Sequence, residues 1–308
     1  MSEHKFDFPS DGLKLAGIVH VPDDLRPGER RAAFLVLHGF GSNKGSGSAQ
    51  RPAEVLAKLG YVALRFDMRG CGDSEGEHAR IICLEQVEDT RNALTALARH
   101  PAVDPDRIGV VGTSFGGAVA VYVGGSDARI AAVISNGGWG DGERKFRGQH
   151  PTPEAWAKFT AMLEEGRRHR ARTGKSLMVP RYDIVPIPQH VRDNLEKQNV
   201  QMFPAGSIEF FPAETAQSMF DFRADDMVGR IAPRPLLLLH SANDSVTPTE
   251  QSIEMFKRAG QPAELHLLSG LDHFMFSENN QRVWSLMHDW LERYFPARQV
   301  AERAAASA

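Results

Sequence analysis

One segment constrains the fold of this 308-residue chain more than any other, and it lies at residues 110–117. Two valines lead directly into Gly112-Thr113-Ser114-Phe115-Gly116, and an alanine- and glycine-rich stretch follows. This order predicts a strand, a sharp turn and a helix. Gly112 and Gly116 have no Cβ, so the backbone can turn sharply and the helix can pack close to the turn. Such a turn exposes the Ser114 hydroxyl beyond the end of the strand, and we expect Ser114 to be a nucleophile.

A nucleophilic serine needs a general base and an acid that orients it, and two later strand ends supply candidates. The apolar run 235–240 predicts a buried parallel strand, and Asp244 follows it in a loop. A second predicted strand, 263–268, leads to His273. We expect His273 to take the Ser114 proton, and Asp244 to hold the His273 ring in the required tautomer.

Neighbouring residues offer alternatives to this assignment. His240 and Asp272 lie close in sequence to the chosen pair and could take their places. Asp244 could also serve only as a turn former or a helix cap. We favour Asp244 because it lies in the loop just past a strand's carboxyl end, and His273 because it lies after the last predicted strand and before the last predicted helix. The order, acid and then histidine, is the one expected after a G-x-S-x-G serine.

The negative charge that develops on an attacked carbonyl oxygen needs backbone N–H donors. One is expected from Phe115, directly after the nucleophile. The predicted strand 33–37 ends at His38-Gly39-Phe40-Gly41, and we expect Phe40 to donate the second N–H. We expect His38 to brace this loop through a hydrogen bond.

A glycine-rich loop, 68–76, follows the predicted strand 61–67. It lacks the lysine of a phosphate-binding loop, so we interpret it as a structural loop near the rim of the site. Asp67 and Arg69 are expected to tie neighbouring loops together.

Together these motifs resemble the α/β-hydrolase superfamily over nearly the whole chain. The segments that carry the resemblance are 38–41, 67–74, 112–116, 243–244 and 272–273. Within the superfamily the chain is similar to bacterial cinnamoyl- and feruloyl-esterase-type enzymes and to serine-aminopeptidase-like hydrolases. The resemblance implies a mostly parallel, doubly wound sheet with an inserted helical cap. It also implies a Ser114–His273–Asp244 triad and an oxyanion hole formed by the Phe40 and Phe115 N–H groups.

The alternation of strand and helix patterns predicts a core domain over 1–138 and 226–308. Residues 139–225 are too many for a simple crossover, and we expect them to form a cap over Ser114. The pattern over 153–172 predicts a helix with a basic side. Its arginines either form a solvated face or bind a substrate carboxylate or phosphate.

Trp139, Tyr182 and Phe211 are the candidate substrate contacts in the cap. Aromatic side chains of this kind could line an acyl or aryl pocket. They could equally form a small core of the cap itself, and the sequence leaves both alternatives open.

The composition narrows the expected partners. A net charge of −3 gives no reason to expect nucleic acid or a membrane surface. The chain has no apolar run near the ~18 residues of a transmembrane helix and begins without a secretory signal pattern. Two cysteines, Cys71 and Cys83, favour a reducing, cytoplasmic compartment. No zinc-ligand spacing or dinucleotide motif is present, so we expect neither metal nor cofactor. The sequence does not decide whether the protein forms a homodimer.

These observations predict a cytoplasmic serine esterase that cleaves a small-molecule carboxylic ester through an acyl-enzyme intermediate. The same residues could instead cleave amides, thioesters or the carbon–carbon bond of a β-diketone-type substrate. A non-catalytic binding protein on the same fold is the third alternative. The complete set of triad and oxyanion-hole candidates argues against it.

Overall fold

The computed structural model describes residues 1–197, 205–277 and 280–298, and over these its centre is an eight-stranded sheet with the order β1-β4-β6-β5-β7-β8-β11-β12. The six strands β6, β5, β7, β8, β11 and β12 pair in parallel with one another. At the other edge, β4 pairs antiparallel with both β1 and β6. Their bounds are β1 (Ser2–Lys5), β4 (Gly17–Val21), β5 (Arg31–Leu37), β6 (Val62–Phe66), β7 (Val103–Thr113), β8 (Ile130–Asn136), β11 (Leu236–Ser241) and β12 (Ala263–Leu268). The predicted fold class is therefore confirmed.

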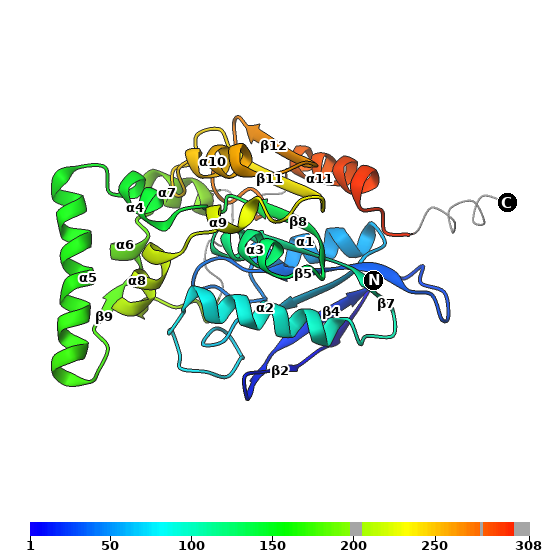
Figure 1. Cartoon of the computed structure of the whole chain (residues 1–308), viewed down its shortest axis with the longest axis horizontal. Coiled ribbons are helices and arrows are strands. Elements are labelled where there is room, and N and C mark those ends of the chain that lie inside the picture. Colours follow the sequence, from blue (N-terminus) through cyan, green and yellow to red (C-terminus); the bar gives the residue numbers. More distant parts are fainter. Residues whose placement is uncertain (198–204, 278–279, 299–308) are drawn as a thin grey trace.

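Helices cover both faces of the sheet (Figure 1). They are α1 (Gly47–Lys58), α2 (Cys83–Leu97), α3 (Phe115–Ser126), α9 (Asp225–Val228), α10 (Glu250–Arg258) and α11 (Gln281–Tyr294). Phe34 of β5 packs in one buried cluster with residues of α1 and α11, including Leu56 and Trp290. The next residue, Leu35, belongs to a second cluster with α2 and α3. Successive side chains of a strand point to opposite faces, which explains why all seven residues of β5 are buried.

The residues 139–225, called here the inserted segment, run between β8 and the return of the chain to β11. They form α4 (Gly142–Gln149), α5 (Pro153–Thr173), β9 (Met178–Pro180), α6 (Arg181–Ile184), α7 (Gln189–Lys197), β10 (Phe210–Pro212) and α8 (Ala213–Asp221). These elements gather beyond one side of the sheet, on the left in Figure 1. The long predicted helix is present as α5, which ends one residue after the predicted 153–172.

The sequence pattern predicts a helix over 52–59, but the first helix of the structure begins earlier. It begins at Gly47, and Pro52 lies inside it. A proline has no N–H, so the Ser48 carbonyl one turn earlier loses its usual backbone donor. The Thr113 hydroxyl donates to that carbonyl at 3.3 Å, a long-range contact that no local pattern indicates.

The sequence pattern predicts that 5–8 and 13–21 form one antiparallel pair with a turn at 10–12, but the structure differs. A small hairpin of β2 (Phe8–Ser10) and β3 (Leu13–Leu15) stands apart from the main sheet, whereas β1 pairs with β4. Asp11 and Gly12 both have positive φ, as a tight two-residue hairpin turn requires. Over the described residues, no helix combines the length and apolar character that crossing a bilayer requires.

Candidate active site

Ser114 lies at a strained turn between β7 and α3. Its φ and ψ are 56° and −112°, a conformation that side-chain-bearing residues rarely adopt. A Cβ on Gly112 would lie 2.0 Å from the Gly116 carbonyl oxygen, and one on Gly116 would lie 2.6 Å from the Leu37 carbonyl oxygen. Strand, turn and helix are therefore packed so closely that only glycine fits at either position.

The structure brings Ser114, His273 and Asp244 into direct contact. His273 Nε2 lies 2.9 Å from Ser114 Oγ, and His273 Nδ1 lies 2.8 Å and 3.1 Å from the two Asp244 carboxylate oxygens. An ionised carboxylate can only accept, so Nδ1 carries the ring proton and Nε2 is left to accept from the serine hydroxyl. This is the tautomer that a general base requires.

Asp244 is buried and held from several sides. Its Oδ1 accepts from the Val246 and Thr247 N–H groups at 2.8 Å and 2.7 Å. Burial alone would raise the pKa of the Asp244 carboxyl, but the charge of His273 and the hydrogen bonds from His240 and His273 outweigh it. Together they hold this pKa well below its usual range, so Asp244 is ionised at neutral pH and can orient the His273 ring.

The two alternative triad residues brace the loops instead. His240 Nε2 lies 3.3 Å from Asp244 Oδ2, on the side away from the serine. Asp272 accepts hydrogen bonds from the Ser245 N–H and hydroxyl and from the His273 N–H. Both residues fix the positions of Asp244 and His273 without occupying those positions themselves.

The two predicted oxyanion donors have free N–H groups. In the described part of the chain, neither the Phe40 nor the Phe115 N–H has a backbone or side-chain acceptor. Phe115 is the first residue of α3, so its N–H is one of the unpaired donors at the positive end of a helix. Phe40 lines the same cavity as Ser114, and Phe115 follows Ser114 directly, so both amides stay candidate oxyanion donors.

His38 fixes the direction of the Phe40 N–H. The Gly39 carbonyl belongs to the same peptide group as this N–H, and it lies 2.8 Å from His38 Nδ1. His38 Nε2 accepts from the Met68 N–H at 3.2 Å, so Nδ1 must carry the proton and donate. Burial lowers the pKa of His38, which favours the neutral ring that this arrangement needs. The predicted bracing role of His38 is confirmed.

The predicted role of Asp67 and Arg69 in tying neighbouring segments together is confirmed. Asp67 accepts from the Lys44 and Asp73 N–H groups and pairs with the Lys44 ammonium at 2.6 Å. Arg69 pairs with Asp89 at 2.7 Å. Asp67 therefore ties the loop after β5 to the loop after β6.

Arg181, at the start of α6, is a site residue that the sequence reasoning missed. Its buried guanidinium donates to the carbonyl oxygens of Phe40 (2.7 Å), Gly41 (2.9 Å) and Ile208 (2.9 Å). It also lies over the rings of Phe40 and Phe211. Burial lowers the pKa of Arg181 to about 10, so the group is charged at neutral pH. The inserted segment thereby holds the loop after β5 through this cation, in addition to the Ile208 N–H, which donates to the Gly41 carbonyl at 3.0 Å, and the Asn43 side chain, which donates to the Ala205 carbonyl at 3.1 Å. No sequence pattern marks the Arg181 contact.

A cavity of about 50 Å³ lies directly beside Ser114 and His273. The inserted segment contributes Arg181, Val185 and Ile187 to its wall, and loops of the sheet contribute residues that include Phe40, Val246 and Phe274. Apolar side chains form much of the wall, and its polar residues besides the reacting groups are Arg181, Ser42, Ser48, Thr113 and Ser277.

None of the three predicted substrate contacts is among the described residues that line this cavity. Trp139 is buried and packs edge-on against the Phe115 ring at 5.6 Å. Phe211 stacks on the outer side of the Phe40 ring at 4.3 Å, and Tyr182 is 41% exposed. Trp139 packs against the Phe115 ring and Phe211 against the Phe40 ring, and Tyr182 lies outside this cavity. Their role as substrate contacts stays a prediction.

The arginines of α5 form the solvated face that was one of the two alternatives. Arg167 and Arg168 pair with Glu164, and Arg170 pairs with Glu214; each arginine side chain is more than half exposed. None of them lines the cavity beside Ser114.

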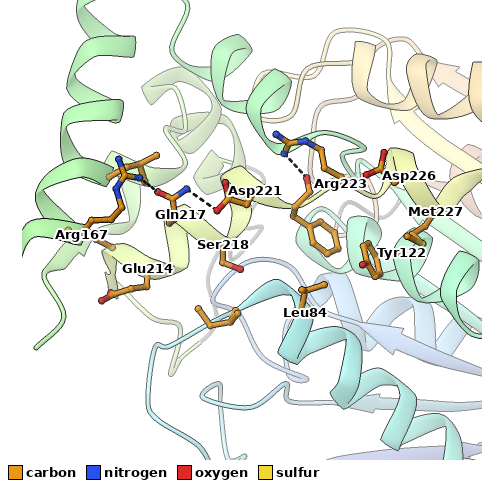
Figure 2. A pocket seen from close by; sticks show the side chains of 15 residues that line it. Leu84, Tyr122, Arg167, Glu214, Gln217, Ser218, Asp221, Arg223, Asp226 and Met227 are labelled. Carbon is orange, nitrogen blue, oxygen red and sulfur yellow. Dashed lines mark hydrogen bonds between the residues drawn. The ribbon is translucent and has the colours of Figure 1, made fainter. Parts of the chain in front are cut away.

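A second cavity, of about 520 Å³, lies between α5, α8 and the neighbouring parts of α2 and α3 (Figure 2). Its polar side chains already contact one another: Arg167 and Asp221 both bond to Gln217. Ser114 and His273 do not line it, so it is separate from the candidate catalytic centre.

Fold and site define a member of the α/β-hydrolase superfamily. A model of the family "Serine aminopeptidase, S33" matches residues 28–280, and the chain belongs to this family. The thiohydrolase aneE of Aspergillus aculeatus is 26% identical, over 85% of this chain and 83% of its own length.

Solved structures agree on the fold. The hypothetical protein PA2218 from Pseudomonas aeruginosa has a TM-score of 0.81 at 23% identity, covering 96% of this chain and 94% of its own. Est1E from Butyrivibrio proteoclasticus, with ferulic acid bound, has a TM-score of 0.65 at 17% identity. The match covers 94% of this chain and 98% of the Est1E chain.

Proposed function

We propose that this protein is a serine esterase that cleaves a small-molecule carboxylic ester through an acyl-enzyme intermediate. The observation that carries the proposal is the continuous chain of contacts from Asp244 through His273 to the Ser114 hydroxyl. The Phe40 and Phe115 N–H groups, which have no acceptor among the described residues, support it. In this proposal the core is 1–138 with 226–308, and the inserted segment 139–225 is its cap.

In the proposed reaction, Ser114 Oγ forms a bond to the substrate carbonyl carbon while its proton moves to His273 Nε2. The carbonyl oxygen becomes an oxyanion that accepts from the Phe40 and Phe115 N–H groups. The bond to the alcohol oxygen then breaks, and His273 gives its proton to the leaving alkoxide. A water molecule, deprotonated by His273, attacks the acyl-enzyme and releases the carboxylic acid and free Ser114.

A thioester is the second candidate substrate. The similar protein from Aspergillus aculeatus is named a thiohydrolase, and a thioester would pass through the same acyl-enzyme. A thiol is a much stronger acid than an alcohol, so its thiolate leaves with less help from the His273 proton. Rates on an ester and a thioester with the same acyl group separate the two substrates.

A fluorophosphonate probe tests the proposed nucleophile. We expect one covalent adduct on the wild-type protein and none on Ser114→Ala, read by intact mass. The variant should also lose turnover of a p-nitrophenyl ester by several orders of magnitude. An unlabelled wild type with a normal melting transition, or full turnover by Ser114→Ala, would contradict the proposal.

A further inference from the structure

The cavity beside Ser114 is too small for the substrate that the proposed function requires. Its volume of about 50 Å³ accommodates no more than a few water molecules. Binding sites for small molecules typically measure ~300–1,000 Å³. The scissile carbonyl fits beside Ser114, but most of the acyl or alcohol part must lie elsewhere.

A larger groove, of about 660 Å³, lies behind two residues of the cavity wall. Ile187 and Val246 line both the cavity and the groove, so the two spaces adjoin at these two residues, called here the partition. These side chains are aliphatic and make no hydrogen bonds. Displacing them therefore breaks only apolar contacts.

The lining of the groove indicates what it can bind. Four prolines stiffen its walls, and Ile253 and Leu267 add apolar surface; the prolines are Pro151, Pro186, Pro188 and Pro248. Among the described residues no lysine or arginine lines it. Its two acidic residues are Glu250 and Asp244, and the Asp244 side chain is fully buried against His273. A phosphate or carboxylate would meet no cation there. An uncharged chain would meet the prolines, Ile253 and Leu267, together with the uncharged polar residues Gln149, Asn243, Ser245 and Thr249.

We propose that this groove is the binding subsite for the uncharged, apolar chain of the substrate, which passes between Ile187 and Val246 while the ester carbonyl lies at Ser114. The inference rests on the proposed esterase function. The partition sets the enzyme's preference for chain length, because a substrate chain too short to pass it makes no contacts with the groove.

Three variants test the subsite against a series of p-nitrophenyl esters from acetate to decanoate. Ile187→Ala opens the partition, and Ile253→Trp fills the groove without touching the cavity. Val185→Ala is the matched control, because Val185 lines the cavity and not the groove. All rates are divided by the concentration of active sites titrated with the fluorophosphonate.

We expect Ile187→Ala to raise the decanoate-to-acetate ratio of kcat/KM about tenfold, and Ile253→Trp to lower it about tenfold. Val185→Ala should change both esters together and leave the ratio near the wild-type value. A parallel series of alkyl acetates shows whether the groove takes the alcohol chain rather than the acyl chain, since only the matching series responds.

The subsite is refuted if Ile253→Trp leaves the ratios of both series unchanged, or if Val185→Ala shifts them as far as Ile187→Ala does. Failure of the proposed function looks different: the wild-type protein then gives neither an adduct nor ester turnover.

Discussion

At the scale of single residues, the turn at Ser114 depends on two glycines that cannot be replaced without moving backbone. We predict that Gly112→Ala lowers the free energy of unfolding by about 1–3 kcal/mol, because the new Cβ would overlap the Gly116 carbonyl. Gly47→Ala is the control, since its Cβ would meet nothing closer than 3.4 Å. Urea titrations followed by circular dichroism measure both variants, and equal midpoints would contradict the prediction.

The same scale shows what the sequence could and could not reveal. Ser114, Asp244 and His273 could be identified because each follows a recognisable strand, in an order that the chemistry requires. The burial of Arg181 and Lys145 could not be predicted, since charged residues are usually exposed. Lys145 is buried beneath the faces of Phe146 and Trp139, and this burial lowers its pKa to about 7. Only the assembled structure shows which charged residues lie inside.

At the scale of elements, α6 holds the loop after β5 through Arg181. We predict that Arg181→Met lowers kcat about tenfold and changes KM little, because the loop's N–H group acts on the oxyanion rather than on the bound ester. Arg181→Lys should recover part of the loss, since it restores the charge but not every hydrogen bond.

Steady-state kinetics with a p-nitrophenyl ester measure this split between kcat and KM. Arg170→Met is the control, because Arg170 is an exposed arginine of the same inserted segment. A variant that only melts at lower temperature, with kcat unchanged per active site, would show that Arg181 has a purely structural role.

Element positions were predictable where a pattern is local. The apolar spacing of Val283, Trp284, Met287, Trp290 and Leu291 predicts a helix over 281–294, and α11 has these bounds because that face of it is buried. The start of α1 and the separate hairpin of β2 and β3 were not predictable. They depend on contacts between distant residues, such as that of the Thr113 hydroxyl with the Ser48 carbonyl.

At the scale of the whole molecule, the order of the motifs allowed the sheet to be predicted, because each motif follows a particular strand of this fold. The inserted segment has no such constraint. Its aromatic residues could be assigned only to a pocket or to a core, and Trp139 and Phe211 proved to be buried. Which inserted residues reach Ser114 depends on how the segment folds back onto the sheet, which composition does not determine.

The antiparallel edge of the sheet gives the whole molecule a pH dependence. His20 of β4 is fully buried, and its Nε2 accepts from Arg65 Nε of β6 at 2.8 Å. Glu3 of β1 lies 3.5 Å from His20 Nδ1, and Glu54 of α1 and the chain's amino terminus also act on the ring. Burial and the Arg65 charge together lower the pKa of His20 from 6.5 to about 4, despite the opposing carboxylates.

Because the unfolded chain binds this proton at a higher pH than the folded chain does, acid favours unfolding. The stability contributed by neutral His20 is complete above about pH 6.5 and is lost as the pH falls toward 4, by about 2–3 kcal/mol in total. His20→Asn keeps an acceptor for Arg65 but does not titrate, so its free energy of unfolding should fall less than that of the wild type. Urea titrations at about pH 7 and pH 4.5 measure the difference, with the half-buried His266→Asn as control. Parallel losses in wild type and His20→Asn would show that other groups cause the acid sensitivity.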